Sequence, residues 1–201
     1  MMTETMTSPR TITPDQLIPL AEYAGRRKQR RQELIAVKKK RRMEVGPFAT
    51  FHFENHATML FQVQEMLFIE KGGDEQVADE IAAYAPLVPQ GRELVATVML
   101  EIEDPVRRAT ALAKLGGIEH TMFLKVAGET IKGTAEDDQE RTNEAGKASS
   151  VHFVHFPFTD AQAARFRAAG TEVVLGFSHP EYGHMALMPD IVRAELAGDF
   201  A

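Results

Sequence analysis

The densest group of potential metal ligands in this chain is His179, Glu181 and His184, in the segment GFSHPEYGH. Side chains two apart on a strand project to the same face, so His179 and Glu181 could contact one ion if the segment is extended. Imidazole and carboxylate together suit zinc, iron or manganese. Pro180 and Gly183 indicate a turn instead. The default prediction is therefore no cofactor, with zinc, iron or manganese at these residues as the alternative.

The fold would have to bring a further ligand to this segment, and His52 and His152 are the histidines considered for that role. His152 and His155 lie three apart on a predicted strand, which places them on opposite faces, so they cannot easily share one ion. A metal site at 179–184 would indicate a metal-dependent redox or hydrolytic enzyme. The chain has no Walker A loop, no G-x-G-x-x-G motif and no complete nucleophile elbow.

A run of positive charge is the strongest feature of the sequence. Ten of the 23 Lys and Arg residues lie between positions 26 and 42, in RRKQRRQELIAVKKKRR, and only Glu33 opposes them. Such polarised charge predicts contact with an acidic surface, on another molecule or on the chain's own acidic loop at 136–147. The predicted interaction surface consists of Arg26, Arg27, Lys28, Arg30, Arg31, Lys38, Lys39, Lys40, Arg41 and Arg42.

Composition excludes several classes of protein. The chain has 201 residues and no cysteine, which rules out disulfides, thiolate nucleophiles and cysteine-ligated metal sites. The first ten residues lack the apolar stretch of a signal peptide, and no stretch approaches the roughly 20 apolar residues of a membrane span. A net charge of −6 argues against a general nucleic-acid binder. We expect a cytoplasmic protein without a membrane contact, and a nucleic-acid-binding module is the weakest alternative.

The basic run is predicted to lie in one long helix, from residue 13 to about residue 43. Thr13 suits the N-cap position, Pro14 suits the first turn, and Gly46 with the proline after it predicts the end. Positions 26–33 are all polar, so this stretch has no apolar face to bury. A helix that is polar all round is exposed, bridges other parts of the protein, or awaits a partner.

Alternating apolar and polar residues over 48–63 predict a β-hairpin after this helix. A three-residue connection at 55–57 puts the apolar side chains on one face, whereas a two-residue turn mixes the faces. Helices are predicted over 64–71 and 77–85, with two glycines between them. The hairpin is expected to place Phe51, Phe53, Phe61 and Val63 in a core, with His52 and Gln62 on its other face.

The second half of the chain shows two strand–helix–strand units in tandem. The first has strands near 94–102 and 121–126 around a helix at 104–115, and the second unit repeats this pattern. Such a tandem is typical of the split-βαβ, ferredoxin-like sandwich. The predicted fold class is therefore α+β: a long N-terminal helix and a hairpin, then a ferredoxin-like antiparallel sheet with helices on one face. The second unit has strands near 151–156 and 172–177 around a helix at 160–169.

Three parts of the chain follow from these elements. We expect a disordered N-terminus over 1–12, a part with the basic helix, hairpin and helices over 13–92, and the ferredoxin-like part over 93–201. The last two parts are predicted to form one continuous domain. A short helix is expected over 189–200.

Four segments in order also carry a family resemblance: GPFATFHFENHATMLFQVQEMLFIEK, VATVMLEIEDP, SVHFVHFPFT and GFSHPEY. Together they resemble a bacterial family catalogued as domain-of-unknown-function family 3501. The resemblance runs from about residue 12 to residue 182. It implies a small cytoplasmic protein of unestablished activity, encoded beside rubrerythrin-like proteins and cysteine-rich iron–sulfur oxidoreductases. It implies no catalytic residues.

These observations favour an accessory protein over an enzyme. A chain without cysteine cannot hold a thiolate-ligated cluster, so assisting a partner that holds one is the role we predict. The expected partner is an acidic protein, of the rubrerythrin-like or iron–sulfur oxidoreductase class, docked on the basic helix. The metal-dependent enzyme with a site around 179–184 is the alternative.

Overall fold

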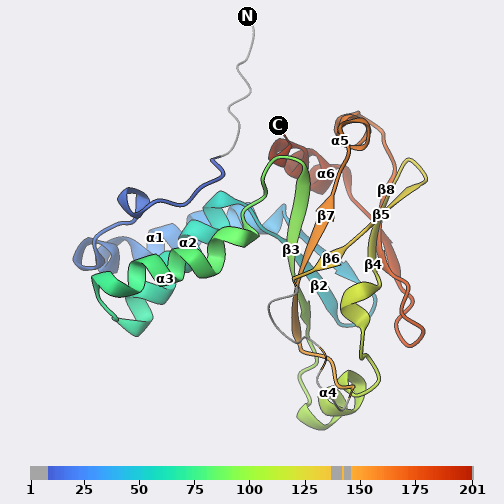
Figure 1. Ribbon diagram of the computed structural model, residues 1–201, viewed down its shortest axis with the longest axis horizontal. Coiled ribbons are helices and arrows are strands. Elements are labelled where there is room, and N and C mark those ends of the chain that lie inside the picture. The colour runs from blue at the N-terminus through green and yellow to red at the C-terminus, as the bar shows by residue number, and fades with distance from the viewer. Residues whose placement is uncertain (1–8, 137–141, 143–145, 201) are drawn as a thin grey trace, which may run out of the picture.

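The computed structural model describes residues 9–136, 142 and 146–200, and its mixture of helices and strands confirms the predicted α+β class (Figure 1). Three helices lie together beside two antiparallel sheets. These helices are α1 (Leu20–Lys39), α2 (His56–Glu70) and α3 (Asp74–Tyr84), and three shorter ones border the sheets: α4 (Pro105–Leu112), α5 (Asp160–Arg167) and α6 (Asp190–Leu196).

The strands divide into two sheets that face each other. Sheet A has the order β1-β2-β3-β7-β6, sheet B has the order β5-β4-β8-β9, and all neighbouring strands are antiparallel. The strands are β1 (Arg42–Val45), β2 (Ala49–Phe53), β3 (Glu93–Leu100), β4 (Met122–Val126), β5 (Glu129–Lys132), β6 (Thr134–Ala135), β7 (Val151–Pro157), β8 (Val173–Phe177) and β9 (Met185–Leu187).

The ferredoxin-like arrangement is not what the chain adopts. That fold requires the four strands of the tandem units to lie in one sheet, whereas β3 pairs with β7 in sheet A and β4 pairs with β8 in sheet B. The two crossover helices are too short and too polar to cover a sheet. Helix α4 buries only Leu112, and α5 buries only Ala163 and Phe166. A second sheet therefore covers the apolar face instead.

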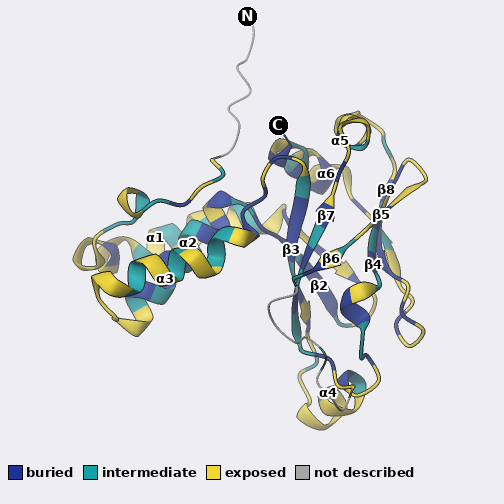
Figure 2. Cartoon of the chain, in the orientation of Figure 1, coloured by how far each residue is buried: buried dark blue, intermediate teal, exposed yellow. Residues whose placement is uncertain are grey.

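The main core fills the space between the two sheets (Figure 2). Side chains alternate along each strand, so β2 sends Ala49, Phe51 and Phe53 inward and leaves His52 half-buried on its outer face. The Phe51 ring lies 5.2 Å from the ring of Phe177, which belongs to the opposite sheet. The predicted burial of Phe51 and Phe53 is thus confirmed.

The predicted hairpin over 48–63 is wrong in its second strand, which is the start of α2. Asn55 caps this helix: its side chain accepts a hydrogen bond from the Thr58 N–H at 3.0 Å, and the Thr58 hydroxyl accepts one from the Asn55 N–H. Met59, Val63 and Leu67 then recur every four residues and are buried, as on a helix. Strand β2 pairs instead with β1, whose first two residues were predicted to be the end of the basic helix.

The basic helix is also shorter than predicted. A single turn of 3-10 helix, Pro14–Gln16, precedes it, and α1 itself begins only after Pro19. The residue before a proline disfavours helical backbone, so Pro19 separates the turn from the helix. The predicted N-terminal disorder over 1–12 lies outside the described residues up to residue 8, as does most of the acidic loop at 136–147.

Helices α1, α2 and α3 pack together beside sheet A, and residues of α2 and α3 form a second, smaller core against the outer face of this sheet. Val95 of β3 and Val88 belong to this core, and so do Met59, Val63 and Leu67 of α2. The predicted break between two helices at 72–73 is confirmed, because α2 ends at Glu70 and α3 begins at Asp74. Within the part of the chain that the structure describes, no helix is long and apolar enough to span a membrane.

Candidate functional site

The segment 178–184 forms a tight turn between β8 and β9 of sheet B. His179 and Tyr182 form an isolated bridge, and the Tyr182 N–H donates to the His179 carbonyl at 3.0 Å. The Tyr182 hydroxyl donates to the Val45 carbonyl at 2.8 Å and accepts from the N–H groups of Phe48 and Ala49. The turn therefore anchors sheet B to the connection between β1 and β2.

Within this turn His179 has both ring nitrogens occupied. Its Nδ1 accepts from the Glu181 N–H at 3.2 Å, so its Nε2, 3.1 Å from the Gly116 carbonyl, acts as a donor. Glu181 and His184 are exposed, and the His184 ring packs against Tyr182. Among the described residues no three His, Cys, Asp or Glu side chains come close enough to hold an ion.

The two further histidines do not converge on the turn. His52 lies on the outer face of sheet A, whereas His152 is completely buried on the inner face, with its Nε2 2.9 Å from the Ser149 carbonyl. The predicted group of ligands is thus spread over three separate places.

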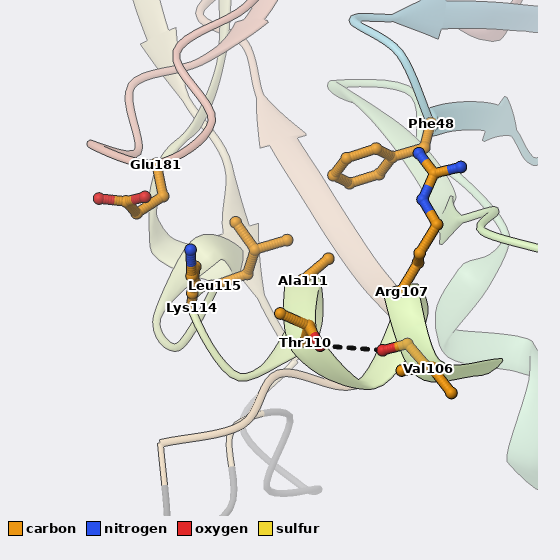
Figure 3. Close-up of a pocket in the computed structure, with 8 residues that line it drawn as sticks. All are labelled: Phe48, Val106, Arg107, Thr110, Ala111, Lys114, Leu115 and Glu181. Atoms are coloured by element: carbon orange, nitrogen blue, oxygen red, sulfur yellow. Dashed lines mark hydrogen bonds between the residues drawn. The ribbon is translucent and has the colours of Figure 1, made fainter. Parts of the chain in front are cut away.

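Glu181 instead lines an open groove of about 440 Å³ beside α4 (Figure 3). Arg107 of α4 and Lys114, which lies two residues after the end of α4, line this groove, and Phe48 closes one end. The Thr110 hydroxyl between the two cations donates to the Val106 carbonyl of its own helix, so it is already satisfied. The groove brings two cations and one carboxylate to an apolar surface.

The basic segment divides into an inward face and an outward face. Arg27 points inward and makes a two-pronged ion pair with Glu65 of α2: its Nε lies 2.8 Å from Oε1 and its Nη2 lies 2.8 Å from Oε2. The Tyr23 hydroxyl donates to the same carboxylate at 2.7 Å, and the Arg27 guanidinium covers the Phe68 ring. The hydrogen bonds from Arg27 hold the pKa of Glu65 below its usual value, and burial raises the pKa of Tyr23.

This ion pair explains how a helix without an apolar face at 26–33 can still pack. The pairing of Glu65 with Arg27 was not predicted from the sequence. The sequence did contain an indication of this pair, because α2 is apolar on nearly every side and a helix of that kind is buried. A carboxylate inside it needs a partner, and an arginine is the common one.

Arg41 is not part of any surface. Only 2% of it is exposed, and it donates to the backbone carbonyls of Phe53 and Glu54 and to the carboxylate of Asp199. Arg41 therefore fastens the end of β2 to the C-terminal turn. Its burial corrects the predicted interaction surface, which included it.

The remaining cations of the run are half-buried or exposed. Three of them pair locally: Arg26 with Glu22, Arg30 with Glu33, and Arg42 with Glu44. The Lys40 Nζ lies 4.0 Å from Glu195 Oε2, and Lys38 is half-buried. Four exposed residues lie along one line of α1, three or four positions apart, and we call them the α1 stripe: Lys28, Arg31, Ile35 and Lys39.

A histidine outside the predicted sites lies beside two carboxylates. His155 Nδ1 lies 2.9 Å from Glu93 Oε2, and its Nε2 lies 3.5 Å from Glu136 Oε1. The hydrogen bond to Glu93 raises the pKa of His155. Burial alone would raise the pKa of Glu93, but hydrogen bonds from His155 and the Gln90 backbone outweigh it and lower this pKa. The pair thus binds β7 to β3 most strongly when both groups are charged.

Replacing His155 with glutamine should therefore destabilise the protein in a pH-dependent way. Because the pKa of His155 is higher in the folded protein than in the unfolded chain, its charged form stabilises the fold. This stabilisation is complete below the unfolded pKa near 6.5 and is lost as the pH rises through the folded pKa. The pKa of Glu93 is lower in the folded protein, so its charged form stabilises the fold at pH values above the unfolded pKa near 4.3. We expect urea denaturation to give a loss of about 1–2 kcal/mol near pH 5–6 that shrinks towards pH 8. The exposed His120→Gln is the control, and a loss independent of pH would contradict the assignment.

Comparisons with known proteins agree with the resemblance seen in the sequence. A crystal structure described as a novel protein of unknown function from Burkholderia pseudomallei is 40% identical to this chain. The likeness covers 95% of this chain and 100% of that one, with a TM-score of 0.88. No curated protein matches the chain. The family described as "Protein of unknown function (DUF3501)" matches residues 11–200, and the chain therefore belongs to that family.

Proposed function

We propose that this protein is a non-enzymatic interaction protein that docks an acidic protein through the α1 stripe. The observation that carries the proposal is Ile35, which is 65% exposed between Arg31 and Lys39 on the solvent side of α1. No carboxylate among the described residues lies within 4 Å of the Lys28, Arg31 or Lys39 cations. An apolar side chain ringed by available cations suits a partner with an apolar pocket and an acidic rim.

The internal pairs of α1 narrow the proposed surface. Arg27 and Arg41 bind groups inside the protein, and Arg26 and Arg30 are paired along the helix, so each has a role without a partner. Of the ten cations, Lys28, Arg31 and Lys39 are the ones that lie, with Ile35, along one continuous exposed line of α1. The family resemblance implies a rubrerythrin-like protein or an iron–sulfur oxidoreductase as the partner. We include this partner class in the proposal and test both proteins.

The test measures binding of the purified rubrerythrin-like protein and iron–sulfur oxidoreductase of the same organism to this protein. We expect the variant Arg31→Glu/Lys39→Glu to bind at least about tenfold more weakly, because it reverses two charges at the rim. Its melting temperature should change by only about 1–2 °C, as for other surface substitutions. Wild-type binding should weaken between about 0.1 M and 1 M salt, where the screening length falls from about 10 Å to about 3 Å.

Arg26→Glu is the matched control. It reverses one charge of the same helix, but at 100° per residue position 26 lies roughly on the far side of α1 from Ile35. A loss in Arg26→Glu equal to that in the single variant Arg31→Glu, which changes the net charge by the same amount, would show that only overall charge matters and would overturn the placement of the surface. Failure of both named proteins to bind would remove the redox partners from the proposal.

A further inference from the structure

The helical layer and the outer face of sheet A enclose a cleft of about 280 Å³. Residues of β2, β3 and β7, of α2, and of the ends of α1 and α3 line this cleft. This volume is close to the lower end for ligand pockets, so the cleft suits a small molecule. Sites between packed layers are common places for such ligands.

The cleft contains a buried carboxylate without a cation. Glu54 is 4% exposed, and the Thr97 hydroxyl donates to its Oε1 at 2.8 Å. No lysine, arginine or histidine nitrogen lies within 4 Å of this carboxylate in the described part of the chain. Burying an ionised carboxylate is costly unless a positive charge and hydrogen bonds compensate it. Glu54 is therefore poised to accept a cationic group from outside.

The same cleft contains an ammonium group without an anion. Lys38, near the end of α1, lines the cleft with its half-buried side chain and makes no ion pair with any described residue. Lys38 and Glu54 therefore do not neutralise each other directly, although both line one small space. A ligand that carries both charges could satisfy each of them.

His52 supplies hydrogen-bonding capacity between these two charges. Glu54 follows β2 directly and lines the same cleft as His52, and neither ring nitrogen of His52 has a hydrogen-bond partner among the residues that the structure describes. Burial lowers the pKa of His52, so its ring is neutral at physiological pH. A neutral imidazole offers one donor and one acceptor, which suits a carboxylate on one side and an ammonium on the other.

We propose that this cleft binds a small apolar α-amino acid in its zwitterionic form. The ligand's ammonium pairs with Glu54, its carboxylate pairs with Lys38, and His52 hydrogen-bonds to the head group. The side chain of the ligand packs on the apolar part of the lining, which comes from Met59, Leu87 and Phe153. This site is separate from the α1 stripe and does not depend on the function proposed for it.

The first experiment removes one charge of the ligand at a time. Isothermal titration of the full chain with L-leucine should give saturable binding. N-acetyl-L-leucine lacks the ammonium and L-leucinamide lacks the carboxylate, so each should bind roughly 10- to 100-fold more weakly, the range for one charge-assisted hydrogen bond. Glycine lacks the apolar side chain and should also bind more weakly. Absence of saturation by L-leucine and L-methionine at about 10 mM would overturn the proposal.

The second experiment assigns each ligand charge to its residue. Lys38→Met should bind L-leucine and L-leucinamide equally, and Glu54→Gln should bind L-leucine and N-acetyl-L-leucine equally. The neighbouring Lys39→Met and the exposed Glu103→Gln are matched controls and should bind as the wild type does. Glu54→Gln keeps the shape of the side chain. If this variant does not fold, the comparison of L-leucine with L-leucinamide in Lys38→Met tests the proposal. Equal discrimination among the ligands in wild type and Lys38→Met would overturn the assignment.

Discussion

Replacing Arg41 with methionine should destabilise the protein by roughly 3–5 kcal/mol, the usual range for breaking one side of a buried ion pair. The loss leaves the Asp199 carboxylate buried without its cation and removes the donors of two backbone carbonyls. For a chain of this length each kcal/mol corresponds to about 2–4 °C in melting temperature. Thermal denaturation followed by circular dichroism would measure the shift.

Two further variants separate the lost pair from a general effect of removing charge. Lys40→Met removes the neighbouring cation, which is mostly exposed and lies 4.0 Å from Glu195, so its loss should stay below about 1 kcal/mol. Burial raises the pKa of Asp199 despite Arg41 beside it, so desolvation outweighs the attraction. Adding Asp199→Leu to Arg41→Met should therefore restore part of the stability. A single variant as mild as Lys40→Met would contradict this structural role.

Local signals in the sequence predicted single elements better than their arrangement. Apolar alternation identified β2 and the faces of Phe51 and His52 correctly, because the side-chain period of a strand is two. The same alternation continued over 58–63 and was misread, since Met59 and Val63 also lie four apart, as on a helix. The capping pair of Asn55 and Thr58 was the local signal that distinguishes the two.

The arrangement of the strands in two sheets could not be predicted from such local signals. The tandem pattern correctly predicted the four strands β3, β4, β7 and β8, yet β3 and β4 lie in different sheets. What decides this is how much apolar area the crossover helices can cover. Helix α4 has only eight residues and buries one of them, so it cannot serve as a layer of a sandwich.

For the candidate surfaces, charge was visible in the sequence but burial was not. Arg31 and Arg41 look alike in a run of cations, although one is exposed and the other is enclosed. Arg41 is enclosed because it meets Asp199, a partner distant in the chain, and Arg27 likewise turns inward towards the distant Glu65. The cleft depends in the same way on two layers meeting, because Lys38 and Glu54 come from separate elements.

Replacing Phe51 with alanine should cost roughly 3–5 kcal/mol, the range for truncating a fully buried aromatic side chain. Phe51 has no exposed surface, and its ring contacts Phe53 and Phe156 within sheet A and Phe177 in sheet B. The truncation opens a cavity where the two sheets meet, which neither sheet can close by moving alone. Urea denaturation gives the free energy of unfolding directly.

The control for Phe51 is Phe61→Ala, which truncates the same kind of side chain at a position the sequence analysis treated as equivalent. Phe61 lies half-buried on α2, outside the core between the sheets, so its loss should be clearly smaller. Phe51→Leu, which keeps most of the volume, should lie between wild type and Phe51→Ala. Equal losses of unfolding free energy in the two alanine variants would mean that the contact between the sheets at Phe51 adds nothing beyond ordinary burial. A loss below about 1 kcal/mol for Phe51→Ala would contradict the place of Phe51 in the core.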